Sequence, residues 1–310
     1  SHTTILTATS GDTGAAVALA FHNQPSVDVV VLYPRGKVSP LQEKLFCTLG
    51  GNVRTIAIED DFDACQKLVK QSFDDPELVQ VLGLNSANSI NVARLLAQVC
   101  YYFEAVAALP PGTEPVLSVP SGNFGNVSAG LVAKALGLPV KRIVAATNQN
   151  DTVPRFFQSS IWDPRPTITT LTTAMDISLP NNFSRILHLE EHHGLTLREI
   201  LSSYAISDAQ TRDAIRALDR IGYVADPHSS LAWTALTQDL AEGETGVFLC
   251  TAHPAKFRET VENVLNRTIS LPLELTQLAD KKILSKPMPA DLSRLRNFLM
   301  VGHFQQAPTS

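Results

Sequence analysis

Hydrophobic and polar positions follow two alternating patterns along this chain. Short apolar runs rich in β-branched residues, which are typical of buried strands, alternate with longer segments of helical spacing. The predicted strands are residues 4–9, 27–33, 53–58, 116–119, 142–147 and 246–251. Strands that alternate with helices predict parallel sheets with helices on both faces, so we expect an α/β protein.

Capping residues mark several of the helix boundaries. Residues 39–42, Ser-Pro-Leu-Gln, form a capping box with proline at the first helical position, and residues 207–210 repeat the box. Asp226 precedes a proline and is expected to cap a third helix. Residues 159–182 are rich in threonine, serine and proline, which predicts a long irregular segment. Long loops are often functional, so this segment is a candidate for covering an active site.

The chain has 310 residues, of which 44% are hydrophobic and 18% are charged. This composition can bury a full core and excludes a disordered protein. The length favours one large domain or two intertwined domains, and residues 110–113, Pro-Pro-Gly-Thr, are the best linker candidate. We therefore expect a smaller domain over residues 1–109 and a larger one over residues 110–310. The net charge of −5 gives no reason to expect nucleic acid or a membrane as a partner.

The chain contains four cysteines, Cys47, Cys65, Cys100 and Cys250. They lie in apolar helix or strand patterns and form no CxxC pair, so we interpret them as reduced core thiols. Reduced thiols indicate a cytoplasmic protein. No apolar run has the length of a membrane span, and no signal peptide is visible. The chain begins directly on a predicted strand, from which we expect that an upstream segment is missing.

Ligands of open parallel sheets bind at the carboxyl ends of the strands, so the residues after each predicted strand are candidates for chemistry. The first strand ends in the turn Thr9-Ser10-Gly11-Asp12-Thr13-Gly14, which collects three hydroxyl groups and several backbone N–H groups at a helix start. Such a turn suits a carboxylate or a phosphate. An ordinary Asp or Ser helix cap explains the same residues equally well.

The fourth strand is followed by Pro120-Ser121-Gly122-Asn123-Phe124-Gly125-Asn126, which also opens a helix. Two glycines allow the backbone to curl so that several N–H groups point into one concavity. The loop is not a Walker loop, because no Gly-Lys-Ser/Thr follows, and it is not a dinucleotide GxGxxG loop. A phosphate held here would depend on backbone dipoles. After the last strand, Thr251 is a weak candidate for a ligand contact.

Two further segments contain polar side chains with a possible chemical use. Residues 85–94, Asn-Ser-Ala-Asn-Ser-Ile-Asn-Val-Ala-Arg, suit a phosphate ester, whereas helix capping with a surface arginine is the plainer interpretation. Residues 188–192, His-Leu-Glu-Glu-His, match the zinc-protease pattern HxxEH. No third ligand motif follows that pattern, so a chance match explains it better than a metal site.

The loop motifs together resemble those of one enzyme family. They are, in order, SGDTG, PRGKxSPLQEKLFCTLGGN, NSANSINxARLLAQ, SGNFGN, ATNxNDTVPRF and TAHPAKF. In this set and order, most of residues 3–265 resembles the bacterial pyridoxal-phosphate-dependent threonine synthases. The resemblance implies fold type II of these enzymes, like the β subunit of tryptophan synthase, with two interleaved α/β domains and largely parallel sheets. It also implies the reaction of O-phospho-L-homoserine with water to L-threonine and phosphate.

The resemblance implies which residues hold pyridoxal 5′-phosphate. The residues that match the cofactor phosphate loop are Gly122, Asn123, Phe124, Gly125 and Asn126. Thr251 matches the residue that faces the pyridine nitrogen, and a neutral hydroxyl there leaves that nitrogen largely unprotonated. Asp12 matches the position that faces the 3′-oxygen of the cofactor. The larger domain, residues 110–310, would therefore hold most of the cofactor.

The resemblance also implies where the substrate binds. Thr9, Ser10 and Thr13 match the loop for the substrate carboxylate, which places this loop in the smaller domain. The positions that match the binding site of the substrate phosphate are Asn88, Ser89 and Arg94. The SGDTG turn is thus expected to hold the carboxylate of an amino acid against the pyridoxal ring.

One departure from the family concerns the catalytic lysine. The lysine that forms the Schiff base with the cofactor lies in an S/A-F-K-D motif upstream of TATSGDTG, and this chain begins too late to include it. The ten lysines of the chain lack that context; Lys256 is the nearest candidate but follows the wrong strand. The catalytic lysine is therefore unknown, the larger domain is expected to be incomplete, and this chain alone is expected to be inactive. The alternative function is a non-catalytic relative that binds a phosphorylated small ligand.

Overall fold

The computed structural model describes residues 2–9, 11–87, 92–194, 196–278 and 280–304, without the side chains of Asp12, Glu274 and residues 302–304. The chain divides into two compact units. The first unit comprises Ser1–Asn91 and Leu271–Ser310, and the second comprises Val92–Ser270.

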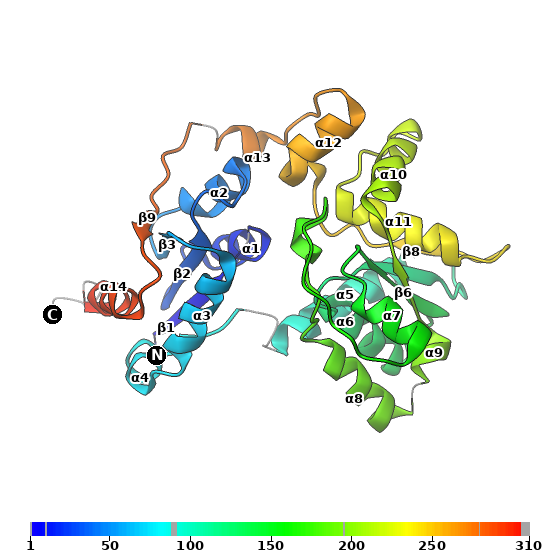
Figure 1. The fold of residues 1–310 in the computed structure, drawn as a ribbon, viewed down its shortest axis with the longest axis horizontal. Helices are drawn as coiled ribbons and strands as arrows, with labels where there is room; N and C mark the ends of the chain where they lie inside the picture. Colours follow the sequence, from blue (N-terminus) through cyan, green and yellow to red (C-terminus); the bar gives the residue numbers. More distant parts are fainter. Residues whose placement is uncertain (1, 10, 88–91, 195, 279, 305–310) are drawn as a thin grey trace. The chain divides into compact units, whose positions relative to one another are not determined.

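The first unit is built on a parallel sheet with the strand order β4-β1-β2-β3-β9 (Figure 1). Its strands are β1 (Thr3–Ala8), β2 (Val27–Pro34), β3 (Val53–Ile58), β4 (Leu84–Asn85) and β9 (Lys286–Met288). Side chains alternate between the two faces, so Val30 and Leu32 enter one core and Val29 and Val31 enter the other. Both faces are buried, which is why β2 is almost continuously apolar.

Helices cover both faces of this sheet. Helices α1 (Asp12–Phe21) and α2 (Pro40–Cys47) contribute to the core on one face. On the other face, the core is formed with α3 (Phe62–Phe73), α4 (Pro76–Leu82) and α14 (Leu292–Phe304). The short helix α13 (Leu273–Thr276) precedes β9.

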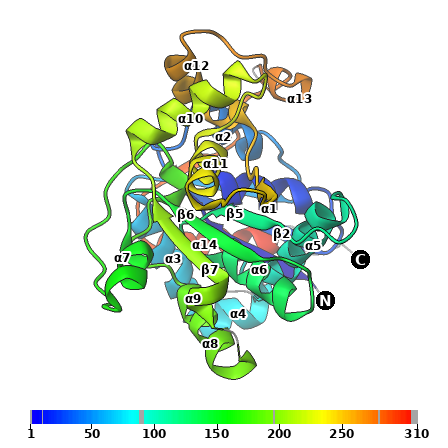
Figure 2. The same ribbon diagram turned by 90° about the vertical axis from the view of Figure 1, so that its right-hand side faces the viewer.

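The second unit is built on a parallel sheet with the strand order β7-β6-β5-β8. Strands β7, β6 and β5 of this sheet lie side by side in Figure 2. Its strands are β5 (Val116–Pro120), β6 (Arg142–Thr147), β7 (Leu201–Ala205) and β8 (Gly246–Phe248). Leu117 and Val119 of β5 belong to one core, while Val116 belongs to the core on the opposite face. The carboxyl end of β5, which leads into SGNFGN, lies between those of β6 and β8 because the strands are parallel.

The helices of the second unit also lie on both faces of its sheet. Helices α5 (Ala93–Ala107), α6 (Gly125–Ala135) and α8 (Phe183–His193) form the larger core with one face. Helix α11 (Pro227–Asp239) covers the other face, and α10 (Asp208–Arg220) contacts α11. The shorter helices are α7 (Thr152–Ser159), α9 (Leu197–Ile200), α12 (Arg258–Leu265) and the 3₁₀ helices η1 (Thr173–Met175) and η2 (Pro254–Phe257).

The α/β class with parallel sheets is confirmed, and each of the six predicted strands is present. The last predicted strand ends at Phe248 rather than at Thr251. Three strands were not predicted: β4, β7 and β9. The capping box at Ser207 and the cap at Asp226 are confirmed, and the segment after α7 is irregular up to α8 apart from η1.

The division into units differs from the predicted boundary after residue 109. Helix α5 belongs to the second unit because Val99 and Tyr102 are buried in the same core as β5 and α6. Residues 271–310 belong to the first unit because β9 pairs with β3 and α14 contributes Leu295 and Leu299 to its core. Residues 110–113 therefore join α5 to β5 inside the second unit.

The interpretation of all four cysteines as core residues is wrong for two of them. All four thiols are free, and Cys47 and Cys65 are buried, whereas Cys100 and Cys250 are exposed. Cys100 lies on the outward side of α5, and Cys250 follows the short edge strand β8. An apolar helical pattern contains outward positions, and periodicity alone did not identify Cys100 as one of them.

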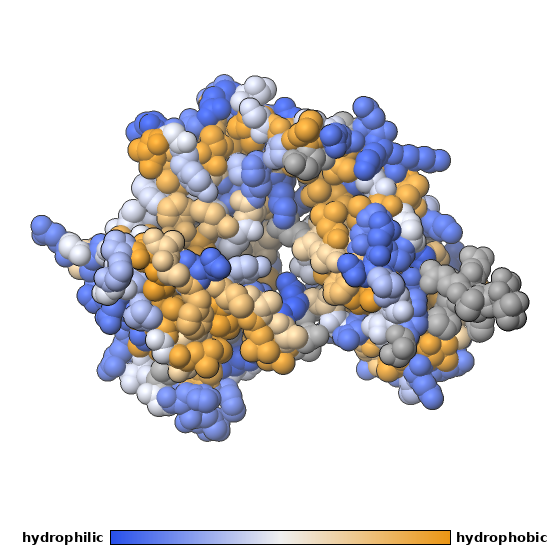
Figure 3. All heavy atoms as spheres, turned by 180° about the vertical axis from the view of Figure 1, so that it is seen from behind, coloured by the Kyte–Doolittle hydropathy of each residue, from blue (hydrophilic) through white to orange (hydrophobic). Residues whose placement is uncertain are grey.

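The surface of the second unit includes exposed apolar side chains. Helix α5 exposes Leu96, Tyr101 and Phe103. Figure 3 shows broad hydrophobic areas on the rear face of the molecule. Among the described residues, none of the helices is long and apolar enough to cross a membrane.

Candidate functional site

The turn after β1 is organised by the side chain of Thr9. The Thr9 hydroxyl oxygen accepts hydrogen bonds from the backbone N–H groups of Gly11, at 2.9 Å, and Gly14, at 2.8 Å. Thr9 is only 1% exposed, so these bonds form in a buried environment. The hydroxyl therefore acts as an internal cap that curls the chain into α1.

The two glycines of this turn are required by close contacts. A Cβ on Gly14 would lie 2.4 Å from Cγ2 of Thr9. Gly11 has a φ of 143°, and a Cβ there would lie 2.9 Å from the side chain of Gln42. Larger residues at either position would displace the turn. The sequence SGDTG thus specifies a narrow backbone shape at the carboxyl end of β1.

The remaining candidates in this turn are Ser10, Asp12 and Thr13. Asp12 is the first residue of α1, and Thr13 follows it in the first helical turn with a half-buried side chain. Ser10 and the side chain of Asp12 lie outside the described residues. The first N–H groups of a helix have no acceptor within the helix, so this end of α1 favours a negatively charged group.

The loop after β5 turns sharply into α6 at Phe124. Phe124 has a left-handed backbone with φ 59°, and its ring packs edge-on against Phe183 with the centroids 5.8 Å apart. The backbone N–H of Ser128 donates to the carbonyl of Phe124. The N–H groups of Gly125 and Asn126 precede that bond and have no acceptor inside the helix. The loop thereby offers backbone donors at the start of an 11-residue helix.

Residues 175–182 hold this loop from outside. Asn182 donates from Nδ2 to the backbone carbonyl of Asn123 at 2.9 Å, and the backbone N–H of Asn181 donates to Oδ1 of Asn123 at 2.6 Å. A Cβ on Gly122 would lie 2.7 Å from Cα of Met175. The absence of a side chain at Gly122 therefore allows the two backbone segments to touch.

The far side of the loop is fixed by α5. The hydroxyl of Tyr102 lies 2.7 Å from both the backbone carbonyl and Oδ1 of Asn126. Tyr102 is fully buried, and this burial raises the pKa of its hydroxyl well above the ordinary value. The hydroxyl therefore remains a neutral donor, and it orients Asn126 from the core.

A buried polar network anchors the irregular segment to the end of β6. Nδ2 of Asn148 lies 2.9 Å from Oγ1 of Thr170 and 2.9 Å from Oδ1 of Asp176. Asn150 donates to the same carboxylate oxygen at 3.3 Å, and Thr170 donates to it from Oγ1 at 2.8 Å. Burial raises the pKa of Asp176, while these donors favour its charged form. The network fixes the part of the segment between Thr170 and Asp176, which contains Met175 and precedes Asn182.

Thr251 lies in the loop after β8. This loop and the loop after β5 are at the same end of the sheet, where the parallel strands have their carboxyl ends. The side chain of Thr251 is exposed. Tyr223 donates from its hydroxyl to Sγ of Cys250, at 3.1 Å, and this contact and burial raise the pKa of Tyr223 to about 12. His253 accepts a hydrogen bond from the N–H of Ala255 and so caps η2. The second unit thus places Thr251 at the same end of the sheet as Gly122–Asn126.

Arg94 is the second residue of α5 and is half-buried. Burial lowers the pKa of its guanidinium, which nevertheless stays charged at neutral pH. Asn88 and Ser89, the other two candidates for a phosphate contact, lie outside the described residues. Arg94 and the SGNFGN loop both belong to the second unit, whereas Thr9 and Thr13 belong to the first.

Comparison with known proteins identifies the family. The family model described as "Pyridoxal-phosphate dependent enzyme" matches residues 1–252, and that described as "Threonine synthase, C-terminal" matches residues 230–299. The threonine synthase of Escherichia coli is 60% identical over 299 residues, which cover 96% of this chain and 70% of that protein. The threonine synthase of Haemophilus influenzae is 58% identical with the same coverage. The chain belongs to the threonine synthase family.

Solved structures support the same assignment. The crystal structure of threonine synthase from Escherichia coli has a TM-score of 0.89 at 59% identity, covering 97% of this chain and 70% of that chain. The structure of threonine synthase from Brucella melitensis, which contains bound pyridoxal phosphate, has a TM-score of 0.90 at 33% identity, with coverages of 99% and 71%. The expected fold type II and the pyridoxal-phosphate dependence of the threonine synthase family are thereby confirmed.

Several residues that organise the site in this threonine synthase family member were not identified from sequence. Asn148 and Asn150 belong to the ATNxNDTVPRF motif, whose sequence alone does not indicate a role for them. Asp176 and Asn182 carry little local signal, because they contact Asn148 and Asn123, which lie 28 and 59 residues earlier in the chain. The polar residues within this irregular segment were the signal from which a buried polar network could have been inferred.

A second buried polar cluster caps α11. Oδ1 of Asp226 accepts from the N–H of His228 at 2.8 Å and lies 2.9 Å from its Nδ1. His228 packs against the ring of Phe257 in the TAHPAKF motif, with the centroids 4.6 Å apart. The cluster therefore links α11 to η2. The histidines of the HxxEH pattern, His188 and His192, stack on each other on α8, and no metal-binding cluster occurs in the described part of the chain.

Proposed function

We propose that this chain is part of an enzyme that converts O-phospho-L-homoserine and water to L-threonine and phosphate. The 60% identity to the threonine synthase of Escherichia coli, over 96% of the chain, carries this proposal. Its six loop motifs and the parallel sheets that carry them agree with the identity. The reaction balances, because water supplies the hydroxyl group of threonine and a proton to the released phosphate.

The loop Gly122–Asn126 is proposed to hold the phosphate of pyridoxal phosphate. The N–H groups of Gly125 and Asn126 have no acceptor within α6, and the helix end favours an anion. Contacts of Asn123 with residues 181 and 182 keep the backbone of this loop in one shape. The residues present therefore fit a phosphate group. When it is bound, the cofactor supplies an electron-withdrawing ring and the protein supplies its orientation.

Thr251 is proposed to face the pyridine nitrogen. Its hydroxyl can share one hydrogen bond with that nitrogen but cannot hold a proton on it, since its own acidity is negligible. Support comes from the position of Thr251 after β8, next to the strand that leads into the phosphate loop. Asp12, at the start of α1, is proposed to face the 3′-oxygen of the cofactor, where one proton must be shared between the two oxygens.

The turn after β1 is proposed to hold the substrate carboxylate through Ser10 and Thr13, with Thr9 also contributing. Thr9 accepts two backbone bonds within the turn, so its main contribution is to shape the loop. Asn88, Ser89 and Arg94 are proposed to bind the substrate phosphate. Arg94 supplies a guanidinium, whose planar arrangement of donors matches a phosphate.

A matched pair of assays tests the proposed reaction. Release of inorganic phosphate is measured with O-phospho-L-homoserine and, as the control substrate, O-phospho-L-serine, in a protein that combines these 310 residues with the lysine motif. We expect phosphate and threonine in equal amounts from the first substrate only. Phosphate without threonine, or equal rates with both substrates, would contradict the proposal.

These 310 residues are proposed to be inactive by themselves. None of their ten lysines lies in the S/A-F-K-D context, and the reaction needs a lysine that bonds to the cofactor and moves protons. The chain is mixed with pyridoxal phosphate, reduced with borohydride and mapped by peptide mass spectrometry. We expect scattered, substoichiometric labelling. Stoichiometric label on one lysine would overturn this, whereas phosphate-ligand binding without turnover would fit the alternative of a non-catalytic relative.

A further inference from the structure

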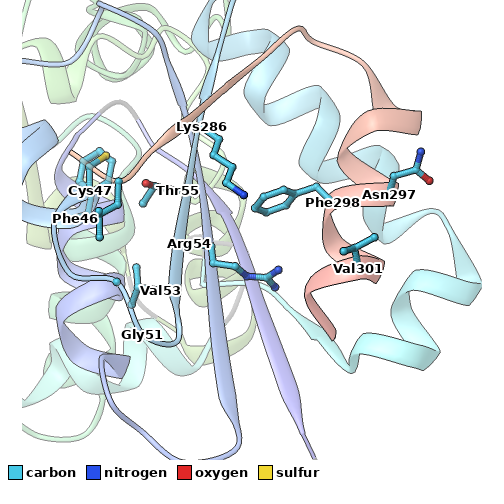
Figure 4. Close-up of a pocket in the computed structure, with 12 residues that line it drawn as sticks. Phe46, Cys47, Gly51, Val53, Arg54, Thr55, Lys286, Asn297, Phe298 and Val301 are labelled. Carbon is cyan, nitrogen blue, oxygen red and sulfur yellow. The ribbon is translucent and has the colours of Figure 1, made fainter. Parts of the chain in front are cut away.

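A pocket lies at the edge of the first unit, where the short strand β9 leaves part of β3 uncovered. It has a volume of about 620 Å³. β9 pairs only with residues 56–58 of β3, so the preceding residues Val53, Arg54 and Thr55 line the pocket. Lys286 of β9 and Phe298 of α14 lie across from them (Figure 4).

Two cations converge on one aromatic ring in this pocket. The guanidinium carbon of Arg54 lies 5.2 Å from the ring centroid of Phe298, and Nζ of Lys286 lies 5.6 Å from the same centroid. Figure 4 shows both side chains directed towards Phe298 from different strands. The ring attracts each cation and so fixes its position, but it carries no net charge that could neutralise either.

Neither cation is neutralised by a carboxylate in the described residues. The ion pairs found in this unit join His2 to Asp28, Arg35 to Glu59, and Arg296 to Asp75 and Glu77. Nε of Arg54 is buried and has no hydrogen-bond partner among the described groups. Burial lowers the pKa of Arg54, and the charge of Asp28 on the neighbouring strand opposes that effect without forming an ion pair.

Two cations held beside one ring without a carboxylate form an electrostatically favourable place for an anion. We propose that this pocket binds a small phosphorylated molecule, whose phosphate lies between Arg54 and Lys286. A phosphate monoester carries nearly two negative charges at neutral pH, which matches two cations better than a single carboxylate does. The planar guanidinium offers two parallel donors to the phosphate oxygens.

The other pocket residues suit the remainder of such a molecule. Asn297 supplies an amide, and Val53 and Val301 supply apolar surface for a carbon skeleton. A volume of about 620 Å³ is in the range of pockets that hold small ligands. The pocket is therefore large enough for a phosphorylated metabolite rather than for a phosphate ion alone.

This pocket is distinct from the turn after β1. The strands of the first unit are parallel, and the turn follows the carboxyl end of β1, whereas Val53, Arg54 and Thr55 lie at the amino end of β3. The two places are therefore at opposite ends of one sheet. A ligand in this pocket would not occupy the proposed substrate-carboxylate loop, so the inference stands apart from the proposed function.

The first test is a titration of the 310-residue chain with inorganic phosphate at constant ionic strength. Backbone amide signals of Val53, Thr55 and Asn297 are followed by NMR, because they report on this pocket alone. We expect saturable shifts in the native chain. Lys286→Gln, which changes an exposed side chain, should weaken the binding about fivefold, and Arg54→Gln should weaken it about tenfold, because charged hydrogen bonds are lost.

The matched control is Lys67→Gln, which removes the same charge from an exposed position of α3 outside the pocket. The control should bind phosphate as the native chain does. Equal weakening in Lys67→Gln and Lys286→Gln would mean that phosphate responds only to net charge, and would overturn the proposal. Shifts that do not saturate, or that persist unchanged in both pocket variants, would also overturn it.

A second readout separates a binding site from a purely structural role. Without phosphate, Lys286→Gln should unfold at the same temperature as the native chain or slightly higher, because two like charges no longer approach each other. With phosphate, the native chain should gain thermal stability relative to equal ionic strength of chloride, and the variant should gain less. A variant that loses stability in chloride and gains fully from phosphate would show that Lys286 is structural and would contradict the proposal.

Discussion

The side-chain amide of Asn182 donates a hydrogen bond to the backbone carbonyl of Asn123, 2.9 Å away and 59 residues earlier in the chain. The backbone N–H of Asn182 also donates to this carbonyl. Asn182 is 1% exposed, so water does not compete for the contact. The irregular segment before α8 is thereby fastened to the proposed phosphate loop, and it acts on the loop as a buried support.

Removing the side chain of Asn182 should weaken cofactor binding. Asn182→Ala leaves one donor to the backbone carbonyl of Asn123 and releases part of the loop, and a buried hydrogen bond of this kind contributes about 1 kcal/mol. We expect about a fivefold rise in the dissociation constant of pyridoxal phosphate, measured by fluorescence quenching. The control is Asn181→Ala, whose contact with Asn123 uses the backbone N–H and survives the change. Equal affinities of the two variants would contradict the role of Asn182.

A methyl group at Gly122 should be more damaging than one at Gly125. The Cβ of Gly122→Ala would lie 2.7 Å from a backbone atom of Met175, so the loop or the irregular segment must move. The Cβ of Gly125→Ala would lie 3.4 Å from Nδ2 of Asn182, which is ordinary contact. We expect pyridoxal phosphate to bind at least about tenfold more weakly to the first variant than to the second, as a buried overlap costs about 1–3 kcal/mol. Similar binding by both variants would contradict this account.

Sequence predicted the sheets of this protein because their strands are buried on both faces. A strand such as β2 is apolar at nearly every position, and that signal is local. Strands β4 and β9 have two and three residues, which are too few to form a pattern. They exist because a neighbouring strand offers hydrogen bonds. The inclusion of residues 271–310 in the first unit depends on such a pairing, and no local pattern could reveal it.

The difference between local signals and long-range contacts also applies to the candidate site. The loops after β1, β5 and β8 were predicted to carry chemistry because parallel strands place their carboxyl ends at one edge of a sheet. Their supports were not predicted. Met175, Asp176 and Asn182 act through contacts with residues far away in the sequence. An irregular segment has no hydrophobic periodicity from which the burial of a side chain could be inferred.

Arg94→Ala should weaken substrate binding more than cofactor binding. Charge-assisted contacts to phosphate contribute about 1.5–3 kcal/mol, so we expect a rise in the KM for O-phospho-L-homoserine of about 10- to 150-fold. The measurement needs a protein that carries the lysine motif, and the dissociation constant of pyridoxal phosphate is measured in the same samples. An unchanged KM, or a lost cofactor with normal substrate affinity, would remove Arg94 from the proposed phosphate site.

Thr251→Asp should change the electronic properties of the bound cofactor, whereas Thr251→Ser should be mild. A carboxylate beside the pyridine nitrogen would hold a proton there and make the ring a stronger electron acceptor. We expect a shifted absorption spectrum and a kcat reduced about tenfold or more, as is usual when charge changes beside a reacting centre. Thr251→Ser retains the hydroxyl and is the matched control. A wild-type spectrum and kcat in Thr251→Asp would show that Thr251 does not face the ring.

An ion-pair network in the second unit should make its stability depend on pH. Arg142, the first residue of β6, donates from Nη1 and Nη2 to the two carboxylate oxygens of Glu244, at 2.8 and 2.7 Å. Its Nε donates to Asp239 at 2.6 Å. The hydrogen bonds from Arg142, followed by that from Lys141, lower the pKa of Glu244 well below its ordinary value of 4.5. The network joins the end of α11 and the turn before β8 to the first residue of β6.

The direction of the pH effect follows from this lowered pKa. Between the pKa of Glu244 in the folded protein and its ordinary value in the unfolded chain, the unfolded chain binds more protons, so stability rises with pH. The contribution of Glu244 is therefore fully present above about pH 5 and is lost as the pH falls towards the folded-state pKa. Glu244→Gln should unfold at a lower temperature than the native chain at pH 7, and the difference should stay constant down to about pH 5 and then shrink towards pH 3. The control is Glu242→Gln, an exposed position in the same turn, for which the difference should stay small at every pH. A gap between native chain and Glu244→Gln that is constant from pH 7 to pH 3 would show that the carboxylate contributes by its shape and not by its charge.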